Sequence, residues 1–175
     1  MLKKLIGRSA SARAKDESGA SAVEMALVLP ILVLLLAGIM DFGLVFNDLM
    51  TMRQGVGSGV RQGIVGQVGN PGSCTIVGAA SANAPTRNLM CQTKSLVGLD
   101  EQKSRTMVYF PGSKVKGGSM ILCHQYPLDS VTSIFDSLLG GVLKAKVEMR
   151  IEQDLSTFGT AAETALPGSD WTWCA

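Results

Sequence analysis

The sequence lacks the residue patterns that most catalytic and metal sites need. It has a single histidine and no CxxC pair, so no typical zinc spacing can be completed. No G-x-S-x-G motif, P-loop or dinucleotide-binding fingerprint occurs in it. His124 follows Cys123 directly in a segment expected to be a strand, where adjacent side chains point to opposite faces, so the two cannot form a nucleophile–base pair. We therefore expect no enzyme, no metal and no cofactor.

Charge is also scarce and has no dominant sign. Only 17% of the residues are charged, and the formal net charge is +2. Residues 1–19 hold five basic and two acidic side chains, and the rest of the chain has 11 basic and 12 acidic ones. The body of the protein is therefore close to neutral, and a nucleic-acid partner has no electrostatic support.

One long apolar run is present, at residues 22–46. As a helix rising about 1.5 Å per residue, it would cross the roughly 30 Å hydrocarbon core of a bilayer. The basic residues lie on its N-terminal side, which by the positive-inside rule places the N-terminus in the cytoplasm and the remainder outside. The sequence thus predicts a single-pass protein of the bacterial inner membrane, with the lipid bilayer as a partner and the rest extracytoplasmic.

All four cysteines follow the apolar run. An even number of cysteines in an exported domain favours two disulfides, for which three connectivities exist. We favour Cys74–Cys91, which brackets one loop, and Cys123–Cys174, which would hold the C-terminal tail. The alternative is that all four are free thiols in a cytosolic fold.

Glu24 lies inside the apolar segment, where a carboxylate costs about 2.5–3.5 kcal/mol on insertion scales. Three interpretations of the segment compete. A cleaved signal peptide would need a small-residue site after the apolar run, and no clear one follows. In an uncleaved anchor, the Glu24 side chain would have to extend to the cytoplasmic edge of the membrane. In the third, the sequence GASAVE from Gly19 to Glu24 has the form of a prepilin processing site, which is cut after the glycine.

The third interpretation gives Glu24 a role. Cleavage after Gly19 would remove the charged leader and make Ala20 the new N-terminus, with an α-amino group of pKa near 8. This cation and Glu24 are four residues apart, so they can pair within one helix or between neighbouring subunits. A buried charge pair of this kind sets the register of neighbouring chains.

The stretch 17–67 resembles the N-terminal signature of TadE-like proteins, the minor pilins or pseudopilins of tight-adherence (Tad/Flp) pili. The matching features are the GASAVE site, ALVLP opening the span, Asp41-Phe42-Gly43 closing it, and a polar continuation to Val60-Arg61-Gln62-Gly63. The resemblance implies a prepilin peptidase substrate, with other pilins and inner-membrane pilus assembly proteins as partners. The alternative is a membrane-anchored or secreted binding or adhesion domain unrelated to pili.

Residues 47–68 continue with helical spacing, and we expect the helix to leave the membrane and to end before Asn70-Pro71-Gly72. Pro30 should kink it. Gly55, Gly59 and Gly63 form a stripe along it, which predicts close packing. We expect them to pack against the protein's own sheet, with another pilin helix as the alternative.

The remainder, residues 69–175, predicts a small extracytoplasmic α+β domain. A short helix is expected near 86–92, strands at 105–110, 119–126 and 143–153, and a short amphipathic helix or apolar loop at 130–141. The segment 143–153 alternates apolar and charged residues with period two, which indicates a strand with one wet face. The predicted architecture is pilin-like: leader 1–19, membrane helix 20–46, helical extension 47–68, and an antiparallel sheet of three to four strands covered by the helix. Trp171 and Trp173 should dock on the sheet or form an exposed patch.

Overall fold

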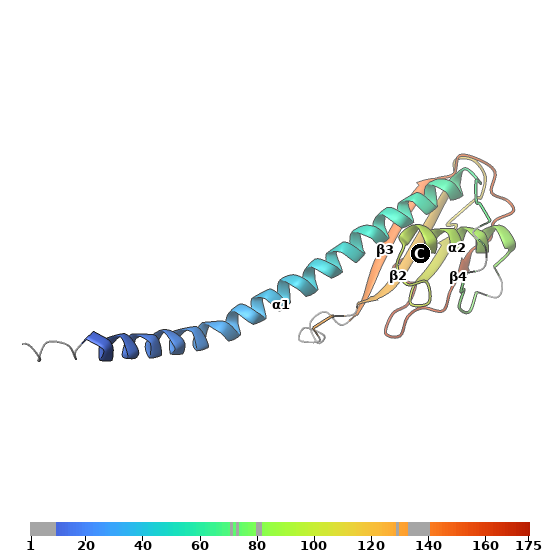
Figure 1. Ribbon diagram of the computed structural model, residues 1–175. Helices are drawn as coiled ribbons and strands as arrows, with labels where there is room; N and C mark the ends of the chain where they lie inside the picture. Colours follow the sequence, from blue (N-terminus) through green and yellow to red (C-terminus); the bar gives the residue numbers. More distant parts are fainter. Residues whose placement is uncertain (1–9, 71, 73, 80–81, 129, 133–140) are drawn as a thin grey trace, which may run out of the picture. The chain divides into compact units, whose positions relative to one another are not determined.

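The computed structural model describes residues 10–70, 72, 74–79, 82–128, 130–132 and 141–175, with the side chains of residues 10–18 left out. The chain divides into two compact units, of which the second is Gly43–Ala175. The first helix, α1 (Ala10–Ile64), is 55 residues long and runs through both units (Figure 1). The segment expected to be an amphipathic helix or apolar loop, 130–141, lies mostly outside the described residues.

Most of the apolar part of α1 lies in the first unit, which ends at Phe42, and the rest lies at the start of the second. Nearly every large apolar side chain from Val23 to Phe46 is exposed, on all sides of the helix. By length and composition, α1 is the one helix of the described chain that could cross a membrane. A helix that is apolar all round is stable only in lipid or against other apolar helices. This segment is therefore a candidate membrane span.

In the second unit, the C-terminal part of α1 packs with α2 (Ala84–Val97) and a four-stranded sheet (Figure 1). The strands are β1 (Arg105–Tyr109), β2 (Ser119–Leu128), β3 (Gly141–Arg150) and β4 (Ala161–Ala162). Their order is β3-β2-β1-β4, with every neighbour antiparallel. The α+β class, the long helix and the antiparallel sheet agree with the prediction.

Alternation along the central strand β2 divides the core into two layers. Met120 and Leu122 point into the main core, which includes Met52 and Val56 of α1 and Leu89 of α2. Ile121 and Cys123 point to the opposite face, where the C-terminal tail covers them with Cys174, Trp171 and Trp173. The indole N–H groups donate to Glu163 O and Asp170 O, at 2.8 and 2.7 Å. The tryptophans therefore dock on the sheet.

Two boundaries differ from the prediction. Helix α1 ends at Ile64, four residues before the expected end at 68, because Gly66 adopts a left-handed φ of 65° and its N–H and that of Gln67 bond back to Gly63 O and Gln62 O. The second helix spans 84–97 where only 86–92 was expected. Asn83 caps it with its side chain on Thr86 N, and left-handed Gly98 ends it.

Candidate functional site

The residues of the expected processing site lie on successive turns of α1. Gly19, Ala20 and Glu24 are all exposed, and nothing lies within 4 Å of the position that a Cβ on Gly19 would take. Ala20 and Glu24 are one turn apart on the same helix face, about 6 Å along the axis. This is the spacing at which two charged groups on a helix can interact.

Pro30 lies inside α1, which continues through it to Ile64. Proline lacks a backbone N–H, so one bond of the helical ladder is missing at this point. The kink that we expect at Pro30 stays a prediction.

The three glycines of the predicted stripe face the protein's own domain. A Cβ on Gly55 would lie 2.4 Å from Val97 Cα, and one on Gly59 would lie 2.5 Å from Thr93 Oγ1. A Cβ on Gly63 would meet the ends of Leu89 and Met120. Among the described residues nearest to the stripe, Val97, Thr93 and Leu89 belong to α2 and Met120 to the sheet, so the stripe packs mainly on α2, whereas we expected the sheet. The short sequence stretch that predicted α2 gave no sign that α2 packs against the glycine stripe of α1.

Substituting two neighbouring glycines of α1 tests this packing. Alanine at Gly55 would force α1 and α2 apart at the Val97 backbone, so we expect it to lower the free energy of unfolding by about 1–3 kcal/mol. Alanine at Gly57, which has nothing within 4 Å, should raise it by up to about 1 kcal/mol through helix propensity. Denaturant unfolding followed by tryptophan fluorescence measures both. Equal effects of the two substitutions would contradict the packing.

The cysteines form the two pairs that we favour from the sequence. Cys74 bonds to Cys91, and Cys123 bonds to Cys174, with Cα–Cα distances of 5.5 and 6.1 Å. The first bond attaches the irregular segment after α1 to α2. The second attaches the tail to the central strand on the face opposite the helices.

A buried ion pair joins elements that are far apart in sequence. Lys94 Nζ of α2 lies 2.7 Å from Glu163 Oε1, just after β4, and both side chains are fully buried. Lys94 also donates to Thr75 O at 2.7 Å, and Glu163 accepts from the N–H groups of Val77 and Thr106, at 2.8 and 2.7 Å. Burial lowers the pKa of Lys94, and the hydrogen bond and charge of Glu163 oppose that lowering. The pair thus holds α2, the segment after α1 and the edge of the sheet together.

His124 lies beside this pair. Its Nδ1 is 3.0 Å from Thr106 Oγ1, and its Nε2 has no hydrogen-bond partner in the described part of the chain. Burial, and secondarily the charge of Lys94, lower the pKa of His124 to about 3. The side chain is therefore neutral at physiological pH. Sequence reasoning separated His124 from Cys123 and did not find the polar cluster that it borders.

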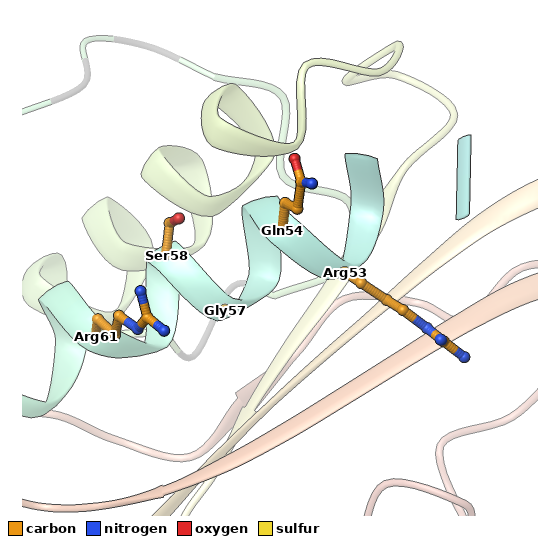
Figure 2. A pocket seen from close by; sticks show the side chains of 5 residues that line it. All are labelled: Arg53, Gln54, Gly57, Ser58 and Arg61. Carbon is orange, nitrogen blue, oxygen red and sulfur yellow. The ribbon is translucent and has the colours of Figure 1, made fainter. Parts of the chain in front are cut away.

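A second surface that sequence reasoning missed lies on α1 within the domain. Arg53, Gln54, Gly57, Ser58 and Arg61 line an open hollow of about 380 Å³. Figure 2 shows the two arginine side chains leaving α1 on either side of Gly57. In the described part of the chain, neither guanidinium forms an ion pair. A glycine between two arginines at four-residue spacing was the available sequence signal.

Comparison with known families identifies the N-terminal part. Residues 19–61 match the family model described as "TadE-like protein". The match begins at the glycine of the expected processing site and ends at Arg61, so the resemblance is confirmed for this segment, which includes the candidate span and the start of its extension. A search of curated proteins and a search of solved structures found no match.

Proposed function

We propose that this chain is a minor pilin or pseudopilin that takes part in assembling a Tad/Flp-type pilus. The observation that carries the proposal is the coincidence of the TadE-like match at 19–61 with an all-round apolar helix that bears Glu24 near its start. The folded unit Gly43–Ala175, with its two disulfides, gives a body far larger than a helix alone. Such a body suits a minor subunit at a tip or base of the fibre.

The processing step would take place at the cytoplasmic face of the inner membrane. A prepilin peptidase would cut after Gly19, and the leader with its five basic residues would be lost. The apolar segment would remain as the membrane helix, with the disulfide-bonded domain outside. Exposure of Gly19 and the free space beside it support access by a peptidase.

Cleavage would also provide the partner that Glu24 needs. The new amino group at Ala20 is mostly protonated at pH 7, and it lies one turn from Glu24 on the same face. In the hydrocarbon, both charges are stable only when paired. The amine of one subunit beside Glu24 of its neighbour would fix their axial register as a subunit leaves the bilayer for the fibre.

N-terminal sequencing of the protein extracted from membranes tests the processing. We expect the mature chain to begin at Ala20, and substitution of Gly19 by a bulky residue such as tryptophan should leave the full-length form. A chain beginning at Met1 or near Gly38 would indicate instead an anchored or secreted binding domain unrelated to pili.

The role of Glu24 is tested by Glu24→Ala. We expect processing to continue, because the glycine and the helix remain, while pilus assembly falls by an order of magnitude or more as the paired charge is lost. Quantitative imaging of pili measures assembly. Glu148→Ala, which removes an exposed carboxylate of β3, is the matched control and should leave assembly unchanged. Normal piliation of Glu24→Ala would contradict the register role.

A further inference from the structure

One face of α1 in the unit Gly43–Ala175 is not explained by the protein's own fold. At 3.6 residues per turn, each residue rotates the helix by about 100°, so Arg53, Gly57 and Arg61 form one stripe. Gly55, Gly59 and Gly63 form another stripe about 160° away, and this second stripe faces α2. The hollow of Figure 2 is therefore on the side of α1 opposite to its own helical partner.

Gly57 is costly for the helix, and no contact with the described residues compensates for that cost. A glycine inside a helix costs about 1 kcal/mol relative to alanine. The backbone of Val97 and the side chain of Thr93 account for Gly55 and Gly59, but nothing lies within 4 Å of the Cβ position of Gly57. A contact with another molecule at this position would account for the missing side chain, because glycine lets a second backbone approach closely.

The positive charges of Arg53 and Arg61 indicate that the molecule bound there carries negative charges. Arg53 and Arg61 are both exposed, form no ion pair within the described residues, and lie eight residues apart. Eight residues correspond to about 12 Å along the axis, and an α-helix with its side chains is about 10–12 Å wide. A helix can therefore lie over Gly57 between the two arginines, with carboxylates reaching the guanidinium groups in the two-pronged geometry that arginine favours.

We propose that the Arg53–Gly57–Arg61 face docks an acidic helix of another pilus subunit. Gln54 and Ser58 border the contact and supply polar groups at its rim. The partner helix presents two carboxylates about 12 Å apart and a small residue opposite Gly57. The identification of the partner as a pilus subunit rests on the proposed function.

A second copy of the chain does not fit this face as well. Copies joined by a two-fold axis at Gly57 would place Arg53 of one against Arg61 of the other. Parallel copies in register would place each arginine against itself. Both arrangements bring like charges together, which costs several kcal/mol at an interface. The family match also extends through Arg61, so this face belongs to the TadE-like segment.

Photo-cross-linking in the intact membrane tests the docking. A photoreactive amino acid replaces exposed Gln54 in the full-length chain, expressed in its own host, and mass spectrometry identifies the cross-linked peptide. We expect an acidic helical segment of another membrane protein. Its yield should fall about tenfold or more with Arg53→Glu/Arg61→Glu, and also in 1 M salt, where the Debye length is about 3 Å.

Two further variants separate docking from folding. Gly57→Leu places a side chain in the hollow, and its Cβ has nothing within 4 Å, so it should abolish the cross-link and leave the thermal stability of the domain unchanged or raised. Arg87→Glu reverses an exposed charge on α2 and should leave the cross-link intact. Absence of an adduct, an adduct with lipid or a second copy, or a yield that survives the charge reversal would overturn the inference.

The N-terminus of the same samples separates this inference from the proposed function. A chain that begins at Ala20 but whose cross-link ignores the arginines would refute the docking alone. A chain that begins at Met1 and still forms a charge-dependent adduct with an acidic helix would refute the prepilin role and leave the docking face established.

Discussion

Replacing Lys94 by methionine should lower the free energy of unfolding by about 3–5 kcal/mol, because it leaves the fully buried carboxylate of Glu163 without its cation. Methionine keeps most of the apolar stem, so lost packing contributes little. Trp171 donates to Glu163 O, and both tryptophans of the chain lie in the tail next to this site. Their fluorescence during denaturant unfolding of the detergent-solubilised protein therefore reports on this part of the domain.

A double-mutant cycle shows whether the loss comes from the charge pair. Glu163→Gln removes the negative charge and keeps one acceptor oxygen, which can serve the N–H group of Val77 or that of Thr106 but not both, because the two bind different oxygens of the carboxylate. In Lys94→Met/Glu163→Gln no charge remains buried, so the double variant should lose about 1–3 kcal/mol less than the sum of the single losses. Additive losses would contradict the assignment. Lys116→Met, at an exposed lysine, should change stability by less than about 0.5 kcal/mol.

Acidification should destabilise the domain through His124. Its pKa is about 3 in the folded protein and about 6.5 when unfolded, so between these values the unfolded chain binds more protons. The contribution of His124 to the free energy of unfolding is therefore fully present above about pH 6.5, and it is lost as the pH falls toward 3. At 1.36 kcal/mol per pKa unit, the loss is about 2 kcal/mol at pH 5 and approaches about 4–5 kcal/mol near pH 3. Denaturant midpoints from pH 7 to 4 measure it.

The groups that face His124 explain the direction of this effect. Lys94 comes from α2 and repels an added proton, Thr106 comes from β1, and the cross-strand neighbour on β3 is Ala145. The hydroxyl of Thr106 can accept a hydrogen bond from the protonated ring, but none of these three groups carries the negative charge that would offset burial of an imidazolium ion. His124→Asn keeps a polar group near Thr106 and does not titrate, so it should remove this share of the pH dependence. An unchanged slope between pH 6.5 and 5 in that variant would show that other groups carry it.

Local patterns in the sequence predicted the elements whose burial repeats regularly. The ten residues of β3 alternate between core and water, and this alternation predicts a strand. The apolar span has no polar face, and this pattern predicts a membrane helix. The predicted strand nevertheless began and ended two to three residues late. Strand ends depend on pairing: β3 begins at Gly141 opposite Leu128 and ends at Arg150 opposite Ser119.

Contacts between distant segments could not be predicted in the same way. Lys94 and Glu163 are 69 residues apart, and each alone looks like an ordinary surface charge. The two-residue strand β4 exists only because β1 offers it a free edge. The prediction that the glycine stripe packs on the sheet was also wrong. A stripe of glycines indicates that another element packs closely, but it does not indicate whether that element is a helix or a strand.

The separation of the cysteines has a consequence for how the chain is made. The ribosome synthesises a chain from its N-terminus to its C-terminus at about 5–20 residues per second. Cys91 follows Cys74 by 17 residues, whereas Cys174 follows Cys123 by 51 residues. In the proposed topology, the first two thiols leave the membrane early and can close their loop before Cys123 arrives. Cys123 then waits about 3–10 seconds for its partner, with no other free thiol of its own chain available to capture it. The order of synthesis thus favours the observed connectivity over the other two.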